Sequence, residues 1–395
     1  MKIDTDPKKI DELLSRNVED IIVKEHLRER LLSGQKLRIK FGIDPTGPSI
    51  HLGRAVPLWK LRAFQDLGHQ IVLIIGDFTA TIGDPSDKLE KRPMLDKKTI
   101  ERNMKEYKKI IGKIIDIKKA EFNYNSKWLK KLNFAEISLL AESFSVQQMS
   151  ARRNFKDRID AGTDISLREF LYPLMQGYDS VAVNADVEIG GFDQLFNLKA
   201  GRTIQKHYGK SEQDILTTAM LEGTDGRKMS TSWGNVILIT DEASDMFGKI
   251  MSVHDDLIVK YFKLVTTVPL TDIEKIEADI KNGMNPRDAK VILGKKVVAM
   301  YHGEAKAEAA HQAFVQTFQK KEIPDDIEEV AAHKDEKLAD FLVRTGVVES
   351  KSEFRRLVEQ KGIHNLSNES VVEDQFIEAH PGTYKIGKRR FIKIK

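Results

Sequence analysis

The fold class can be inferred from residues 37–76, which read LRIKFGIDPTGPSIHLGRAVPLWKLRAFQDLGHQIVLIIG. Apolar residues alternate over 37–43, which is the period of a strand with one buried face. They then recur at spacings of three and four over 52–67, and Gly68 follows where a helix C-cap is expected. Residues 70–76 are almost continuously apolar, as in a strand covered on both faces. A strand, a helix and a buried strand in this order predict a βαβ unit with a parallel sheet.

The pattern continues beyond this unit. Helical periodicity and short apolar runs alternate over the ranges 99–115, 187–189, 193–208 and 215–221. We therefore expect one α/β domain over residues 1–235. Residues from about 136 to 180 are largely helical and predict an insertion into that domain, which could serve dimerisation.

The pattern becomes mostly helical after residue 235 and predicts an α-helical domain over 236–330. Polar residues interrupt the periodicity at 323–326 and 331–334, which predicts a linker near residue 330. Two short helices and then short strands follow, so we expect a small α+β module over 336–395.

Composition narrows the function classes. Lys and Arg number 64 against 60 Asp and Glu, for a net charge of +4, so any nucleic-acid affinity must come from local basic clusters. The chain has no cysteine, which excludes disulfides, thiolate nucleophiles and zinc sites with sulfur ligands. No signal peptide and no run of about 18 apolar residues is recognisable. We therefore expect a cytoplasmic protein with no membrane partner.

Two segments could bind phosphate. His51-Leu52-Gly53-Arg54 opens the first helix, where free N–H groups and the helix dipole favour an anion. The loop Gly226–Ser232 offers a lysine and several hydroxyls after a strand candidate. Each has a plain alternative, because His51 could be a satisfied surface residue and the loop a solvated turn. Their joint occurrence at opposite ends of one α/β domain favours phosphate binding.

These segments carry a family resemblance. Asp44-Pro45-Thr46 with His51–Arg54 resembles the HIGH signature of class I aminoacyl-tRNA synthetases, and Lys228–Ser232 resembles their KMSKS loop. Tyr-Pro-Leu-Met-Gln-Gly-Tyr-Asp at 172–179 is similar to the amino-acid pocket of tyrosyl-tRNA synthetases of the bacterial type. The segments Gly190–Gln194 and Gly83–Ser86, the latter followed by Lys88 and Arg92, resemble the same family. The likeness covers essentially the whole chain, and residues from about Glu336 resemble the RNA-binding module first seen in ribosomal small-subunit protein four.

The resemblance implies a Rossmann-like catalytic domain followed by a helical domain on the anticodon side and the RNA-binding module. It implies that tyrosine is activated with ATP to tyrosyl-adenylate and pyrophosphate and is then transferred to tRNA(Tyr). The implied partners are ATP, L-tyrosine, tRNA(Tyr) and a second copy of the chain bound through the insertion. Mg²⁺ is expected to arrive with ATP, without a dedicated protein metal site.

The resemblance also implies roles for individual residues. Catalysis is assigned to His51, Thr46, Lys228, Lys88 and Arg92. ATP binding is assigned to Asp44, His51, Gly53, Arg54, Gly191, Asp193, Lys228, Met229, Ser230, Thr231 and Ser232. Tyrosine binding is assigned to Asp84, Tyr172, Gln176, Asp179 and Gln194. RNA binding is assigned to Lys351, Arg355, Arg356, Lys361, Lys388, Arg389 and Arg390.

Spacing agrees with two of these assignments. Tyr172, Gln176 and Asp179 share one face of a helix, where Asp179 could accept a hydrogen bond from a phenol. The alternative is an ordinary amphipathic helix with these polar residues facing water. Lys351 and Arg355 are one turn apart on a basic face that could neutralise RNA phosphates, or that could serve solubility alone.

The chain departs from the family pattern at four positions. Arg54 replaces the second histidine of the first signature, Thr231 replaces the second lysine of the loop, Asp87 stands where glycine is common, and Lys40 stands where some relatives place a pocket tyrosine. Arg227 or a bound monovalent cation could replace the charge missing at Thr231.

Three other functions stay open from the sequence. They are a tryptophanyl synthetase, a catalytically weakened RNA-binding paralogue and a general nucleotidyltransferase. Tyrosine-dependent exchange of pyrophosphate into ATP separates all three from the tyrosyl enzyme.

Overall fold

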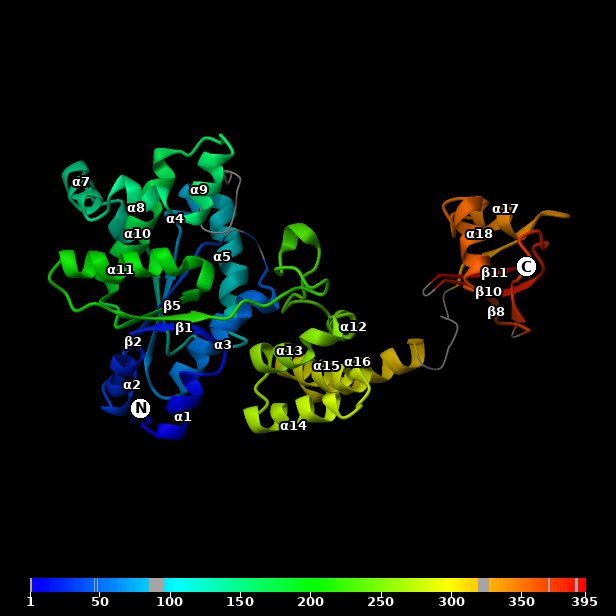
Figure 1. Cartoon of the computed structure of the whole chain (residues 1–395), viewed down its shortest axis with the longest axis horizontal. Helices are drawn as coiled ribbons and strands as arrows, with labels where there is room; N and C mark the ends of the chain where they lie inside the picture. Colours follow the sequence, from blue (N-terminus) through cyan, green and yellow to red (C-terminus); the bar gives the residue numbers. More distant parts are fainter. Residues whose placement is uncertain are drawn as a thin grey trace. The chain divides into compact units, whose positions relative to one another are not determined.

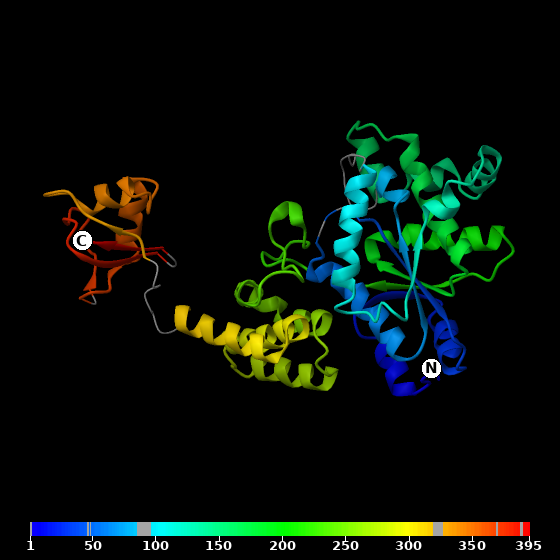
Figure 2. The ribbon, with the colours of Figure 1, turned by 180° about the vertical axis from the view of Figure 1, so that it is seen from behind.

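The structure is a computed structural model that describes residues 2–45, 47, 49–84, 96–318, 327–368, 370–387 and 390–395. The chain divides into two compact units, Met1–His311 and Gln312–Lys395 (Figures 1 and 2). Each unit has its own sheet and its own core.

The first unit is built on a six-stranded sheet with the strand order β1-β6-β5-β2-β3-β4. All neighbouring strands are parallel except β1, which pairs antiparallel with β6 at one edge. The strands are β1 (Val18–Ile22), β2 (Arg38–Ile43), β3 (Gln70–Ile75), β4 (Glu121–Tyr124), β5 (Val187–Gly191) and β6 (Asp214–Thr218). The predicted α/β fold class with a parallel sheet is confirmed.

The predicted βαβ unit is present as β2, helix α3 (Leu52–Asp66) and β3. The two strands pair in parallel from Arg38 opposite Gln70 to Ile43 opposite Ile75. Gly68 follows α3 with a φ of 97°, a left-handed conformation that disfavours any side chain. On its other side β2 pairs with β5, so the strand order reverses at β2. In such sheets ligands bind beyond the carboxyl ends of the strands at this reversal.

Helices cover both faces of the sheet (Figures 1 and 2). Helices α3 and α5 (Lys97–Ile111) lie on one side, and α10 (Leu167–Val183) and α11 (Leu195–His207) lie on the other. Gly177 lets α10 approach α11, because a Cβ there would lie 2.7 Å from Ile204 Cδ1. The other helices of this part are α1 (Pro7–Leu13), α2 (Lys24–Leu32), α4 (Thr79–Ile82), α6 (Ser126–Leu129), α7 (Phe134–Glu142), α8 (Val146–Ser150) and α9 (Arg153–Asp160). Among the described residues no helix is long and apolar enough to cross a membrane.

The helices that follow residue 235 belong to the same compact unit as the sheet up to His311, so the predicted boundary at 235 does not separate two such units. Contacts from the N-terminal segment explain this. Arg16 donates hydrogen bonds to the main-chain oxygens of Thr266 (2.6 Å) and Val268 (2.8 Å), and Trp59 Nε1 donates to Tyr301 OH at 2.9 Å. These helices are α12 (Ala243–Met251), α13 (Ile258–Val265), α14 (Leu270–Lys281), α15 (Pro286–His302) and α16 (Glu304–Phe318).

The described residues of the second unit contain a five-stranded sheet in the order β7-β11-β10-β8-β9 and two helices besides the end of α16. Strand β7 pairs in parallel with β11, with Glu329 opposite Lys393. The sheet therefore begins before residue 336 and includes part of the predicted linker, because a two-residue strand leaves no periodic pattern in the sequence. The elements are β7 (Glu329–Val330), α17 (Leu338–Arg344), α18 (Lys351–Glu359), β8 (Ile363–Asn365), β9 (Ser370–Val371), β10 (Gly382–Ile386) and β11 (Arg390–Ile394).

Candidate active site

The two predicted phosphate-binding segments meet at the start of α3. The main-chain N–H of Gly53 points at Met229 Sδ with a separation of 3.4 Å. A Cβ on Gly53 would lie 3.1 Å from His51 Nδ1 and 3.7 Å from Met229 Cβ, so the glycine permits this close approach. Leu52 N donates to Ile237 O, which anchors the chain beyond the loop to the same helix start. Residues far apart in the sequence thus form one site beyond the carboxyl end of β2.

His51 caps α3 and is uncharged there. Its Nδ1 accepts a hydrogen bond from Arg54 N at 3.3 Å, so the ring proton is assigned to Nε2. Burial, together with the positive charges of Arg54 and Lys228, lowers the pKa of His51 to about 3. The side chain is therefore a neutral donor at a helix N-terminus. Arg54 itself is exposed and donates to Tyr107 OH of α5 at 2.9 Å.

Lys228 lies beside the end of β5. Its Nζ forms an ion pair with Asp193 Oδ2 at 3.0 Å, and both side chains are partly exposed. Gly191 makes room for Asp193, because a Cβ on Gly191 would lie 2.5 Å from Asp193 Oδ1. Three residues predicted to bind ATP are thus brought together.

A residue that the sequence reasoning missed, Asn235, holds the loop that carries Lys228. Its Oδ1 accepts from Ser230 N at 2.8 Å, and its Nδ2 donates to Lys228 O (3.1 Å) and to Asp225 Oδ1 (2.7 Å). The side chain is only 4% exposed. The one local signal is the preceding Gly234, whose φ is 67°. Asn235 therefore fixes the main chain on which the predicted phosphate ligands are mounted.

The remaining loop residues have distinct surroundings. Arg227 donates to Asp225 Oδ2 and lies 4.9 Å from the centre of the Trp233 ring. The hydrogen bond from Asn235, with those from Arg227, lowers the pKa of Asp225 to about 2. Thr231 is exposed at the start of a short 3₁₀ turn. Arg227, proposed from the sequence to replace a missing charge, is thus already paired with a carboxylate.

Tyr172 and Asp44 belong to a second group of polar residues. Tyr172 OH donates to Asp44 Oδ2 at 2.8 Å, and Thr79 Oγ1 donates to Asp44 Oδ1 at 2.7 Å. Gly76 is essential to this arrangement, because a Cβ there would lie 1.9 Å from Asp44 Oδ1. Burial and the neighbouring carboxylates raise the pKa of Tyr172 well above its usual value, so it stays a hydroxyl donor.

Asp179 lies on the same helix and is 3% exposed. Its Oδ1 accepts from Trp128 Nε1 at 2.7 Å and its Oδ2 accepts from Asn125 Nδ2 at 3.3 Å. Burial raises the pKa of Asp179 to about 7 against the opposing effect of Lys40. The alternative of an amphipathic helix with these residues facing water is wrong for Tyr172 and Asp179, which are both buried. The sequence carried no signal for Asn125 and Trp128, which follow the unpredicted strand β4.

The other three predicted tyrosine ligands make polar contacts nearby. Gln194 Nε2 and Asn197 Nδ2 each donate to Asp84 at 3.4 Å. Arg152, which the sequence reasoning missed, donates to Asn197 Oδ1 at 3.1 Å. Gln176 Nε2 donates to Glu188 Oε1 at 3.0 Å, so its side-chain amide is held by strand β5 of the sheet.

The predicted RNA-binding residues of the second unit divide into two groups. Lys351 pairs with Asp340, Lys361 pairs with Glu373 at 3.2 Å, and Arg390 pairs with Glu353 at 2.8 Å. Arg355 and Arg356 project from α18 as exposed side chains.

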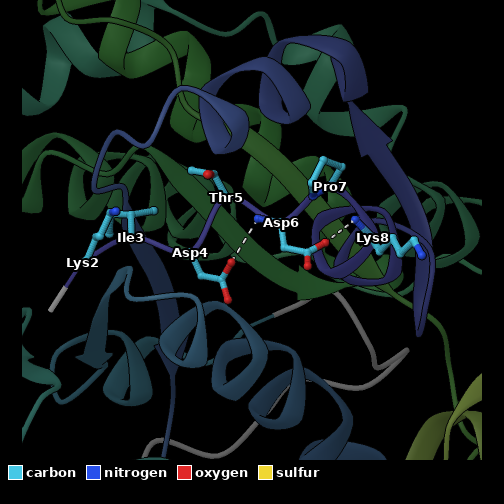
Figure 3. A pocket seen from close by; sticks show the side chains of 7 residues that line it. All are labelled: Lys2, Ile3, Asp4, Thr5, Asp6, Pro7 and Lys8. Atoms are coloured by element: carbon cyan, nitrogen blue, oxygen red, sulfur yellow. Dashed lines mark hydrogen bonds between the residues drawn. The ribbon is translucent and has the colours of Figure 1, made fainter.

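Some predicted residues cannot be placed. Thr46, Lys88, Arg92, Lys388 and Arg389 lie outside the described residues, as does Asp87, and of Ser232 only the main chain is described. A cavity of about 870 Å³ elsewhere is lined only by Lys2–Lys8 (Figure 3). Asp4 and Asp6 there accept main-chain hydrogen bonds from Asp6 and Lys8, and none of the predicted site residues lines it.

Comparison with known proteins gives consistent results. The family model described as tRNA synthetases class I (W and Y) matches residues 32–319. A tyrosine–tRNA ligase of Thermotoga maritima is 46% identical over 97% of this chain and 96% of that protein, and one of Carboxydothermus hydrogenoformans is 45% identical over 97% of each. The crystal structure of a C-terminally truncated mitochondrial tyrosyl-tRNA synthetase of Aspergillus nidulans matches with a TM-score of 0.65 at 24% identity, over 78% of this chain and 94% of that one. The structure of the Archaeoglobus fulgidus tyrosyl-tRNA synthetase complexed with L-tyrosine matches with a TM-score of 0.62 at 22% identity, over 78% and 100% of the two chains.

Proposed function

The chain belongs to the class I tRNA synthetases for tryptophan and tyrosine, and we infer from this membership that it is a tyrosine–tRNA ligase. It activates L-tyrosine with ATP and transfers the tyrosyl group to tRNA. The observation that carries this inference is the sequence identity of 45–46%, over nearly the full length of the chain, with relatives that are tyrosine–tRNA ligases. The site agrees, because the two signature segments meet, and Asp44 of the first accepts a hydrogen bond from the buried Tyr172.

We propose that the tyrosine substrate is recognised at both ends. Asp179 would accept the phenol hydrogen, and a phenylalanine would leave this carboxylate desolvated and without that partner. At the other end Asp84, Tyr172, Gln176 and Gln194 would hold the ammonium and carboxylate groups. The hydrogen bonds already made in this group support the proposal, because they orient the acceptors before the substrate arrives.

Activation needs no nucleophilic side chain, because the substrate carboxylate itself attacks the α-phosphorus of ATP and pyrophosphate leaves. The protein contributes position and stabilisation of the charge that develops on the phosphates. We propose that His51 Nε2–H donates to a phosphate oxygen at the N-terminus of α3, where the helix dipole also favours an anion. Burial keeps this imidazole uncharged, so it acts as a hydrogen-bond donor and not as a cation.

Lys228 and Asp193 would exchange partners when ATP binds. Asp193 would then accept hydrogen bonds from the ribose hydroxyls, and the ammonium group of Lys228 would bind the phosphates. The ion pair between the two side chains keeps both of them at the proposed ATP site. Gly53, Arg54, Gly191, Met229, Ser230, Thr231 and Ser232 complete the proposed ATP site, with Asp44 beside it. Thr46, Lys88 and Arg92 remain proposed phosphate ligands from the sequence alone. Mg²⁺ would come with the nucleotide, since this ion usually keeps substrate phosphates among its ligands.

We propose that the second unit binds the tRNA. Arg355 and Arg356 offer exposed charges on one helix, and a contact to RNA phosphates should weaken steeply as salt rises. Lys351, Lys361 and Arg390 would have to exchange a carboxylate for a phosphate, so we expect smaller contributions from them. Lys388 and Arg389 remain proposed contacts from the sequence.

The insertion is the proposed dimer contact. The three most exposed large apolar side chains of the described residues all lie in or next to it, namely Phe134 (86%), Leu167 (80%) and Val146 (72%). Apolar groups this exposed in one region are typical of a protein interface. Sedimentation should therefore give a dimer, and Phe134→Asp should shift it towards the monomer. A wild-type monomer at micromolar concentration would overturn this assignment. We place the reaction in the cytoplasm, where ATP and tRNA are available.

The activity is tested by exchange of labelled pyrophosphate into ATP. The purified chain should catalyse exchange with L-tyrosine and not with L-tryptophan or L-phenylalanine, and it should then charge tRNA(Tyr). Lys228→Met should reduce exchange while leaving the thermal unfolding temperature near that of the wild type, because Lys228 is a partly exposed side chain. Exchange that depends on tryptophan, or no exchange at all, would contradict the proposed function.

A further inference from the structure

A buried ion pair lies under the proposed tyrosine site. Lys40 of β2 and Glu188 of β5 face each other across the two parallel strands, and both are fully buried. Lys40 Nζ lies 2.8 Å from Glu188 Oε1. The family resemblance implies a pocket tyrosine at this position in some relatives, where this chain has Lys40.

Every polar group of this pair has a partner. Lys40 Nζ also donates to Gln176 O at 2.8 Å and to Ser180 Oγ at 2.7 Å, which uses all three hydrogens of the ammonium group. Glu188 accepts from Gln176 Nε2 at 3.0 Å, from Ser180 Oγ at 3.2 Å and from Gln213 Nε2. Such complete satisfaction is the condition under which a buried ion pair is tolerated.

The partners of the pair are concentrated on helix α10. Gln176 and Ser180 are one turn apart and are bound by both charges. The pair therefore fixes the rotation and height of α10 on the sheet. Asp179 lies between these two residues on α10, so its position on the sheet is fixed together with theirs.

Stability alone gives a weak reason for the pair, because buried ion pairs can often be replaced by apolar residues without loss. We propose that Lys40 and Glu188 are positioning residues for tyrosine recognition: they hold Gln176 and Ser180, and with them the turn of α10 that carries Asp179, in place on the sheet. This inference rests on the proposed tyrosine site and adds a part to it that does not touch the substrate.

The electrostatics of Asp179 support the role of Lys40. Lys40 is the largest influence that lowers the pKa of Asp179, followed by the hydrogen bonds from Trp128 and Asn125. Burial raises that pKa, and so does the charge of Glu188. The charge of Asp179 also contributes to the raised pKa of Tyr172 on the same helix, which stays neutral. The balance leaves the pKa near 7, where a change of charge at position 40 alters the ionised fraction most.

The test compares Lys40→Met with the double variant Lys40→Met/Glu188→Gln. The single variant leaves a buried carboxylate without its cation and should lower the unfolding temperature. The double variant removes both charges and keeps an oxygen to accept from Gln176, so its unfolding temperature should recover. Lys60→Met is the matched control, because Lys60 is another buried lysine of the same unit, bound to main-chain oxygens on α1 and beyond.

The measurement is KM for tyrosine in pyrophosphate exchange between about pH 5.5 and pH 9. In the double variant KM for tyrosine should rise several-fold near pH 7. Lys40 affects the pKa of Asp179 more strongly than Glu188 does, so removing both charges shifts this carboxyl towards its neutral form and weakens its hydrogen bond to the phenol. The acid limb, which is the fall of 1/KM for tyrosine as the pH decreases, should also move to higher pH. KM for ATP should stay unchanged. Lys60→Met should change neither KM nor the limb.

Two results would overturn the inference. One is a folded double variant whose KM for tyrosine and acid limb match the wild type, since the pair would then serve packing only. The other comes from Ser180→Ala, which removes a hydroxyl shared by both charges without altering either. It should raise KM for tyrosine by roughly tenfold or more, the effect of losing hydrogen bonds to charged groups, and an unchanged KM would exclude the positioning role. A wild-type protein without tyrosine-dependent exchange would instead refute the proposed function.

Discussion

Replacement of His51 gives the sharpest test of the phosphate site. The ring is an uncharged donor whose Nδ1 is occupied by Arg54 N, so only Nε2–H is available to a phosphate oxygen. A hydrogen bond from a neutral donor to a charged acceptor contributes about 1.5–3 kcal/mol. Loss of this donor in His51→Ala should therefore slow tyrosine activation by about 10- to 150-fold.

The assay is pyrophosphate exchange at saturating ATP and tyrosine. The measured rate is then kcat, and the titration of Asp179, which affects the binding of tyrosine, does not alter it. If the hydrogen bond forms mainly in the transition state, kcat should fall and KM for ATP should stay nearly constant. His51→Asn is the matched control, because asparagine is a good N-cap and also carries a donor. It should retain more activity than the alanine variant and unfold at a similar temperature to the wild type.

The pH dependence separates a neutral donor from an imidazolium. With a pKa of about 3, His51 stays unprotonated throughout the physiological range, so kcat should have no limb near pH 6.5 that depends on this residue. The wild type and His51→Asn should give kcat profiles of the same shape. A wild-type limb near pH 6.5 that disappears in His51→Asn would refute the neutral-donor reasoning.

Three further outcomes are expected. Burial lowers the pKa of Lys60 from 10.5 to about 7, so the unfolded chain binds more protons between these values and the free energy of unfolding should rise with pH across that window; urea titrations of Lys60→Met should show a flatter rise, and an identical slope would contradict it. Gly76→Ala places a Cβ 1.9 Å from Asp44 Oδ1, and this overpacking should cost about 1–3 kcal/mol in calorimetry and raise KM for tyrosine. Asn235→Ala should loosen the loop around Lys228, seen as faster proteolysis between residues 226 and 232 and a KM for ATP raised roughly tenfold or more; unchanged proteolysis would argue against its role.

The parts of the fold that were predictable are those whose signal is local. The alternation at 37–43, the helical spacing at 52–67 and the apolar run at 70–76 each report which face of one element is buried, and the structure has all three elements. Strands β1 and β4 were missed, because both lie at the edges of the sheet and are partly exposed, which weakens any apolar pattern.

The candidate site was predictable only where its residues lie close in sequence. The helix spacing of Tyr172, Gln176 and Asp179 placed them on one face, and the structure shows that this face is directed inward for Tyr172 and Asp179. Their partners come from other elements and had no signal of their own. Trp128 and Glu188 are examples, because each reaches α10 only through the folding of the chain.

The parallel α/β architecture and the two phosphate-binding segments could be predicted from the sequence, because backbone periodicity and turn chemistry are local properties. The folded structure was needed to show that His51 is uncharged, that Lys228 pairs with Asp193 and that Lys40 pairs with Glu188. These properties depend on burial and on distances of a few ångströms between residues from different elements. No pattern along one strand or helix contains that information, because it arises when the strand order brings β2 beside β5.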